Sequence, residues 1–262
     1  MVSEKAEGIL LQAKGFVGVL GGEPEQHDGM KALQGPDFST SKQGSCTFGV
    51  YSRNSANDSV DQENTILFTG SPFFQEGRPW DGSVAEYKAL DGKFAIAKIA
   101  PQSVELATDV LGAGAVFYIY VKSHFFFASH LGLLLKVLPF APALNPLGVA
   151  AQLYARAQLF DETHFSGIFR LAAGSVLTAE HELHSQSVQV KTTQRRGARS
   201  LLDIKAPTFG PDTLMTVLGR GVARYRFDEK SVLMLSGGRD SLAIALANER
   251  APKHAVTYGD HS

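Results

Sequence analysis

The stretch SVLMLSGGRDSLAIALA, residues 231–247, decides how the second part of this chain folds. Its residues 232–235 form a short apolar run, which is typical of a buried strand. Gly237 and Gly238 come next, and the apolar residues after them have helical spacing. The pattern therefore predicts a strand, a glycine turn and a helix, in that order.

This layout brings backbone N–H groups and a helix N-terminus together, where they can bind an anion. Glycine lets the backbone adopt positive φ and approach a ligand closely. Ser236 and Ser241 add hydroxyl donors, and Asp240 can hold a metal ion on bound phosphates or cap the helix. A glycine turn with an ordinary helix cap is the alternative. The Walker A pattern GxxxxGK[ST] is absent from the sequence, so the expected phosphate loop is of a different type.

The composition is that of a soluble globular protein, with 262 residues, 44% hydrophobic and 19% charged. The formal net charge of −1 and the lack of a basic stripe predict no nucleic-acid binding. Cys46 is the only cysteine, which excludes an internal disulfide and favours a reducing compartment. No apolar run reaches the ~18 residues of a membrane span, and no signal peptide is expected. We therefore expect a cytoplasmic protein without a membrane partner.

The residue composition differs between segments of the chain. Residues 23–45 are rich in Gly, Pro, Asp, Gln and Ser and predict a loop. Short apolar segments between residues 93 and 129, separated by turn signals, predict stacked antiparallel strands. A polar, charged stretch begins at residue 191, and a helix is predicted over 211–227. The pattern predicts an α+β domain over 1–190, a linker over 191–210 and the start of an α/β domain over 211–262.

Several stretches resemble motifs of the asparagine synthetase family, whose relatives include β-lactam synthetases and lasso-peptide cyclases. They are SGGRDS at 236–241, LDGKFA at 90–95, FASH at 127–130 and FSGIFRLAAGSVL at 165–177. The resemblance implies a first domain of the class II glutamine amidotransferase type, with two stacked sheets between helices. It also implies a second domain of the adenine nucleotide α-hydrolase-like, PP-loop type. Because that second domain is short here, we expect the chain to be a C-terminally truncated member.

The residues at the expected glutaminase site depart from the family pattern. Active members use a cysteine at residue two, where this chain has Val2. Residues 15–18 resemble the family's first strand, and Lys14 falls where the cysteine would stand. Residues 69–71, Thr-Gly-Ser, are the nearest counterpart of the family's glutamine-holding Asn-Gly-Glu. Cys46 lies on an apolar strand without a free α-amine, so we expect no glutaminase activity and assign no catalytic residue to the first domain.

The resemblance also implies an ATP site that includes a strand residue before the loop, the loop itself and a residue on the next strand. These residues are Leu235, Ser236, Gly237, Gly238, Asp240, Ser241 and Tyr258. The implied ligands are ATP and Mg²⁺, with Asp240 as the residue that would hold the metal ion.

The implied activity is that of an ATP-dependent, amide-bond-forming ligase of amino-acid biosynthesis. Such an enzyme adenylates a carboxylate, releases pyrophosphate, and lets ammonia or an amine displace AMP. The expected partners are a small-molecule or peptide carboxylate and an amine, and a homodimer is left open. Two alternatives remain: a β-lactam or lasso-peptide type of cyclase, and a non-catalytic nucleotide-binding scaffold.

Overall fold

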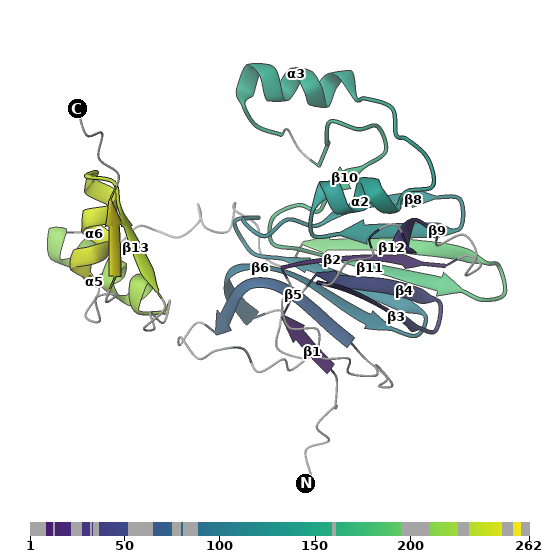
Figure 1. The fold of residues 1–262 in the computed structure, drawn as a ribbon, viewed down its shortest axis with the longest axis horizontal. Coiled ribbons are helices and arrows are strands. Elements are labelled where there is room, and N and C mark those ends of the chain that lie inside the picture. Colours follow the sequence, from purple (N-terminus) through teal and green to yellow (C-terminus); the bar gives the residue numbers. More distant parts are fainter. Residues whose placement is uncertain are drawn as a thin grey trace, which may run out of the picture. The chain divides into compact units, whose positions relative to one another are not determined.

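The chain folds into two compact units, Met1–Pro72 with Trp80–Leu201 and Phe73–Pro79 with Leu202–Ser262. The computed structural model describes residues 9–12, 14–21, 28–31, 33, 37–51, 65–74, 80, 89–158, 161–194, 210–224, 231–247 and 254–257. The first unit contains two six-stranded sheets, and the second contains a two-stranded sheet with helices (Figure 1).

The first sheet has the strand order β1-β5-β6-β7-β11-β12. Its strands are β1 (Ile9–Gln12), β5 (Thr65–Phe74), β6 (Leu90–Ala100), β7 (Ser103–Thr108), β11 (Ser175–Glu182) and β12 (Ser187–Gln194). β1 and β5 are parallel, whereas β6, β7, β11 and β12 form an antiparallel run.

The second sheet has the strand order β10-β8-β9-β2-β4-β3 and is antiparallel throughout. Its strands are β10 (Phe169–Arg170), β8 (Phe117–Val121), β9 (His124–Ala128), β2 (Gly15–Leu20), β4 (Cys46–Tyr51) and β3 (Phe38–Gln43). The antiparallel strands predicted over residues 93–129 are therefore confirmed, although they divide between the two sheets.

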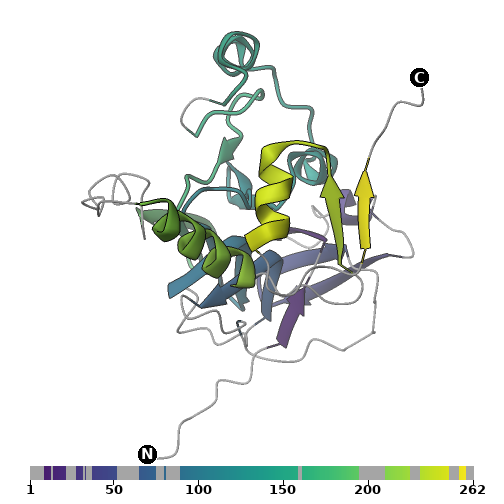
Figure 2. The same cartoon turned by 90° about the vertical axis from the view of Figure 1, so that its left-hand side faces the viewer.

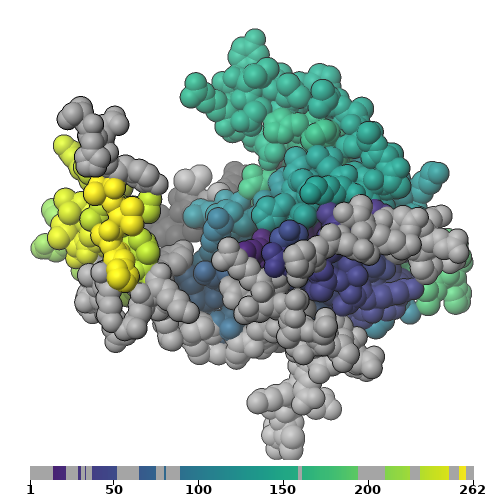
Figure 3. All heavy atoms as spheres, viewed as in Figure 1, coloured from purple at the N-terminus to yellow at the C-terminus, as the bar shows by residue number. Residues whose placement is uncertain are grey.

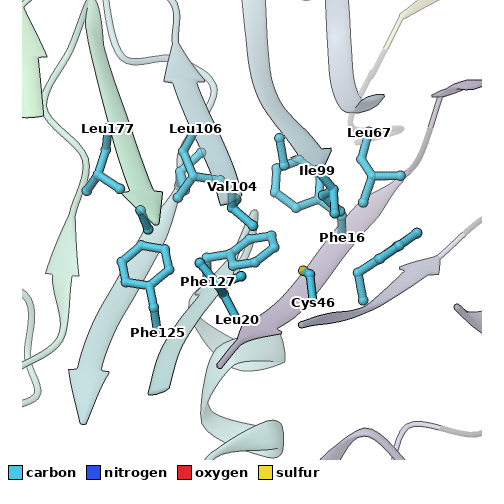
Figure 4. Packing of buried hydrophobic residues seen from close by; sticks show 14 of the residues in the cluster. Phe16, Leu20, Cys46, Leu67, Ile99, Val104, Leu106, Phe125, Phe127 and Leu177 are labelled. Carbon is cyan, nitrogen blue, oxygen red and sulfur yellow. The ribbon is translucent and has the colours of Figure 1, made fainter. Parts of the chain in front are cut away.

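The two sheets stack face to face, and β2 shows how. Because side chains alternate along a strand, Phe16 and Leu20 point into a core shared with Leu106 and Leu177 of the first sheet (Figure 4). Val17 and Val19 belong to a second cluster, which includes residues of α1 (Asp28–Lys31) and α2 (Leu131–Val137). β2 is therefore covered on both faces, which explains its continuous apolar sequence.

The prediction of a loop over residues 23–45 is wrong in part. This range contains α1 and the complete strand β3, which pairs with β4 over six residues. β3 has the sequence FSTSKQ and lies at the end of the sheet. An edge strand needs few apolar residues, and Ser39, Thr40 and Lys42 of β3 are exposed, so the apolar alternation of a strand is missing.

The start of the predicted linker also needs correction. β12 continues to Gln194, which pairs with Ser175 of β11, so residues 191–194 belong to the first unit's sheet. Their polar sequence reflects an exposed edge strand rather than a linker.

Helix α3 (Pro146–Ala155) projects from the rest of the first unit (Figures 1 and 3). Asn145 caps it by accepting the backbone N–H of Leu147 at 3.1 Å, and proline occupies its first position. Its Leu153 and Tyr154 are 75% and 92% exposed. Over the described residues, none of the helices has the length and apolar character needed to cross a membrane.

The second unit consists of α5 (Pro211–Arg224), β13 (Val232–Leu235), α6 (Arg239–Ala247) and β14 (His254–Thr257). β13 and β14 are parallel, with Leu235 paired to Thr257, and α6 connects them (Figure 2). The predicted strand, glycine turn and helix are therefore present as a β-α-β unit.

The burial predicted for the strand over residues 232–235 is wrong in the described structure. Val232 and Met234 are each 49% exposed and Val256 is 44% exposed, whereas Leu233 and Leu235 are less exposed. Because side chains alternate along a strand, only one face of β13 is covered, by α6. The other face of this two-stranded sheet is open among the described residues.

One buried carboxylate fixes the end of the first sheet. Asp109, which directly follows β7, is 1% exposed. Its Oδ2 accepts the backbone N–H groups of Phe94 at 3.2 Å and Gly114 at 2.6 Å. Its Oδ1 accepts those of Leu111 at 3.0 Å and Ala113 at 3.1 Å. Four backbone donors on one side chain hold the loop 109–114 against β6.

We expect Asp109→Ala to lower the free energy of unfolding by about 3 kcal/mol or more, because it leaves buried N–H donors without an acceptor. Chemical denaturation followed by circular dichroism measures the change. Glu180→Ala, which removes an exposed carboxylate of β11, is the matched control and should change stability by no more than about 0.5 kcal/mol. Equal stability of the two variants would contradict the structural role of Asp109.

Candidate functional site

Three of the seven predicted residues, Ser236, Gly237 and Gly238, lie in the loop between β13 and α6, and Asp240 and Ser241 lie near the start of α6. Gly237 has φ +74°, a conformation that residues with a side chain rarely adopt. A Cβ atom on Gly237 would meet nothing within 4 Å, so open space faces the loop at this point. The sequence therefore needs glycine here for the backbone conformation, not to avoid a neighbouring group.

Hydrogen bonds within the loop bring its two serines together. Ser236 Oγ lies 3.4 Å from Ser241 Oγ and accepts the backbone N–H of Gly238 at 3.4 Å. Ser241 Oγ donates to the Gly238 carbonyl at 3.1 Å, and that carbonyl also accepts the N–H of Leu242. Gly238 thus acts as the N-cap of α6, and Asp240 lies in the helix's first turn.

The loop lies at the carboxyl edge of two parallel strands. Leu235 and Thr257 are paired and end their strands at the same edge. Ser236, Gly237, Gly238 and Asp240 are exposed, so a ligand can reach them. Open α/β sheets bind ligands at this edge. The structure thus brings six of the predicted residues to one place, whereas Tyr258 lies outside the described residues.

A separate cavity of about 480 Å³ lies in the first unit. Its lining includes Lys14, which precedes β2, and Thr69 and Gly70 of β5. The sequence singled out these positions as counterparts of a glutaminase site. The structure therefore brings Lys14 and Thr69 together at one cavity, although they are far apart in the sequence.

The chemistry of this cavity differs from that of a thiol site. None of its lining residues is a cysteine, and Lys14 and Lys93 bring positive charge. Cys46 is fully buried on β4, and burial raises the pKa of its thiol well above the usual range. A buried thiol with a raised pKa is a poor nucleophile, so Cys46 is a core residue.

Sequence reasoning missed the contribution of Ser129 and His130 to the cavity. Ser129 Oγ accepts the backbone N–H of Phe16 at 2.9 Å and lies 2.9 Å from His130 Nδ1. A Cβ atom on Gly15 would lie 3.1 Å from His130 Nδ1, so glycine leaves room for the ring. No acidic or cysteine side chain lies close to His130 in the sequence, so the local sequence gives no reason to place it in a site. Its position in FASH, at the end of a buried strand, was the available signal.

The described residues contain no group of three or more His, Cys, Asp or Glu side chains that could hold a metal ion. Asp240 is thus a single carboxylate at the loop. A magnesium site formed with phosphate oxygens needs only one or two carboxylates, because Mg²⁺ keeps several water ligands. The loop suits this type of site and not a metal site made by protein groups alone.

Comparisons with known proteins gave similar structures but no sequence relatives. No family model matches the chain, and no curated protein matches it. One similar structure is the glutamine phosphoribosylpyrophosphate amidotransferase from B. subtilis complexed with ADP and GMP. It has a TM-score of 0.42 and 13% identity over 93% of this chain and 65% of that chain.

A second structure, described as the allosteric regulatory enzyme of purine biosynthesis, has a TM-score of 0.41 and 12% identity. The match covers 95% of this chain and 66% of that one. The chain thus spans slightly less than two thirds of the length of these proteins.

We expect the purified chain to release no glutamate from glutamine above the level of a protein-free control. No thiol lines the cavity, and the Cys46 thiol is buried and protonated. A coupled glutamate dehydrogenase assay measures the release. Cys46→Ala is the control, since glutamate release by the native chain that this variant lacks would show that Cys46 acts as a nucleophile after all.

Proposed function

We propose that the chain binds ATP through residues 236–241 and belongs to a ligase that activates a carboxylate by adenylation. The carboxylate attacks the α-phosphorus, the bond to the pyrophosphate group breaks, and an acyl-adenylate forms. Ammonia or an amine then displaces AMP to give an amide. The observation that carries the proposal is the exposed Ser-Gly-Gly loop at the carboxyl edge of β13 and β14.

The loop offers donors suited to pyrophosphate. Ser236 and Ser241 lie with their hydroxyl groups 3.4 Å apart, next to the N-terminus of the nine-residue helix α6. A helix N-terminus carries partial positive charge and favours phosphate groups. Donors fixed in advance stabilise the negative charge that develops on a leaving pyrophosphate. These residues would bind and orient the phosphates and would not act as nucleophiles.

The same loop fits a magnesium ion that accompanies ATP. Asp240 is exposed in the first turn of α6, so its carboxylate is accessible to a metal ion. When bound, Mg²⁺ would neutralise part of the charge on the phosphates. Asp240 is therefore the residue that we propose to hold the metal ion, with phosphate oxygens and water as the other ligands.

The source of nitrogen follows from the cavity in the first unit. Because its lining contains no cysteine, we propose that the enzyme uses free ammonia or an amine of its substrate rather than glutamine. A cyclase, which closes a ring with an amine of its own substrate, has the same requirement. This feature keeps the cyclase as a second candidate within the same reaction class.

The loop is tested by titrating the 262-residue chain with inorganic pyrophosphate in the presence of Mg²⁺, followed by calorimetry. We expect Asp240→Ala to weaken binding by about tenfold or more, because a charge-assisted contact is lost. Ser236→Ala should weaken it by only about threefold, since a neutral hydrogen bond is worth less. Asp212→Ala, which removes the first-turn carboxylate of α5, is the matched control and should bind like the native chain.

Carboxylate activation is tested separately by ATP–pyrophosphate exchange with a panel of carboxylates. Exchange that requires an added carboxylate and Asp240 supports the ligase. Pyrophosphate binding without exchange for any carboxylate would favour the scaffold. If the native chain and Asp240→Ala bound pyrophosphate equally well, the proposed metal role of Asp240 would be wrong. Asp240 would then be only a first-turn residue of α6.

A further inference from the structure

A second cavity in the first unit, of about 680 Å³, is lined by aromatic and acidic side chains. Its volume falls in the range of small-molecule sites. The aromatic residues are Tyr118 and Tyr120 of β8, Phe125 of β9 and Phe169 of β10. The cavity belongs neither to the phosphate loop nor to the cavity beside Lys14.

The arrangement of the two sheets explains why these aromatic side chains are accessible. β12 is the last described strand of the first sheet and contacts β9, whereas β8 and β10 lie further along the second sheet. Tyr118 and Tyr120 share the face of β8 that points toward the first sheet, opposite Ile119, which belongs to the cluster with α1 and α2. No described strand covers this face beyond β12, and Tyr120 is 48% exposed.

The rings form a continuous surface around Tyr118. Its ring centroid lies 5.8 Å from that of Phe125 and 5.7 Å from that of Phe169, and both pairs are tilted. Phe125 is fully buried, so it fixes the position of Tyr118 from the core side. Faces of aromatic rings carry negative charge density, which attracts a cation within about 6 Å of the ring centre.

Asp161 and Glu162 supply negative charge at the same cavity, and none of the other described residues that line it is a Lys, Arg or His. Glu162 Oε2 accepts a hydrogen bond from Asn145 Nδ2 at 2.6 Å, so the side chain that caps α3 also positions this carboxylate. The pKa of Tyr118 is raised, first by burial and then by the negative charge of Asp161. The field of Asp161 therefore reaches the phenol group of the central ring.

We propose that this cavity binds a small organic cation of the alkylammonium class. The rings of Tyr118, Tyr120 and Phe169 surround the cationic group, and Asp161 and Glu162 provide the opposite charge. An anion would be repelled by the two carboxylates, and a neutral apolar ligand would gain nothing from them. The site is independent of the proposed ATP-binding loop.

The proposal is tested by titrating the 262-residue chain with choline and, separately, with its neutral isostere 3,3-dimethylbutan-1-ol. Proton NMR measures the upfield shift of the ligand's methyl signals, which arises when they lie over aromatic rings. We expect saturable binding of choline and an affinity for the alcohol that is weaker by about fivefold or more. Choline carries a positive charge and the alcohol does not, so this difference isolates the charge.

Two exposed positions in the cavity offer variants that should fold normally. We expect Tyr120→Leu and Asp161→Asn each to weaken choline binding by about three- to fivefold. Tyr154→Leu on α3 and Glu180→Gln on β11 remove an exposed aromatic ring and an exposed carboxylate elsewhere, so choline binding should stay unchanged. Asp240→Ala should also leave choline binding unchanged, which separates this site from the proposed function.

Equal affinity for choline and the alcohol, or choline binding that neither cavity variant weakens, would overturn the proposal. The proposal would also be overturned if neither choline nor a second cation, butylammonium, gave a saturable shift. A third probe, N-acetyl-trimethyllysine methylamide, distinguishes the source of the cation. Tighter binding of this probe than of choline supports a cation carried on a peptide, and weaker binding supports a free small molecule.

Discussion

The first unit depends on the buried carboxylate of Asp109. Through four backbone N–H groups it holds the loop 109–114 against β6. Its backbone carbonyl also accepts the N–H groups of Gly112 and Gly174, which ties the loop to the start of β11. Three strands of one sheet are thereby fixed at the same end. The loop includes Ala113 and Gly114, which line the cavity beside Lys14, so the same side chain supports the fold and shapes a candidate site.

The two cavities of the first unit differ in charge because different parts of the sandwich form them. The cavity beside Lys14 lies at strand ends, where Lys14 and Lys93 bring positive charge. The aromatic cavity lies at the open side of the second sheet, where Asp161 and Glu162 bring negative charge. One stacked pair of sheets therefore presents two cavities that are lined by charged side chains of opposite sign, and neither has a thiol among its lining residues.

The second unit presents its candidate site differently. Its donors come from a short loop whose geometry depends on Gly237 and on the two serines. The loop is exposed, and so is one face of β13. The proposed nucleotide site thus depends on the local conformation of six residues, whereas the cavities of the first unit form by long-range assembly of distant ones.

The sequence by itself determined the local features of this protein. The apolar run, the Gly-Gly pair and the helical spacing in residues 231–247 predicted the β-α-β unit and its loop, because each depends on contacts between near neighbours in the chain. Only the tertiary structure decided which strands share a sheet, why the polar segment FSTSKQ is strand β3, and that His130 joins Lys14 at a cavity. These features depend on strand pairing and packing between residues far apart in the chain, and a local sequence pattern does not specify such contacts.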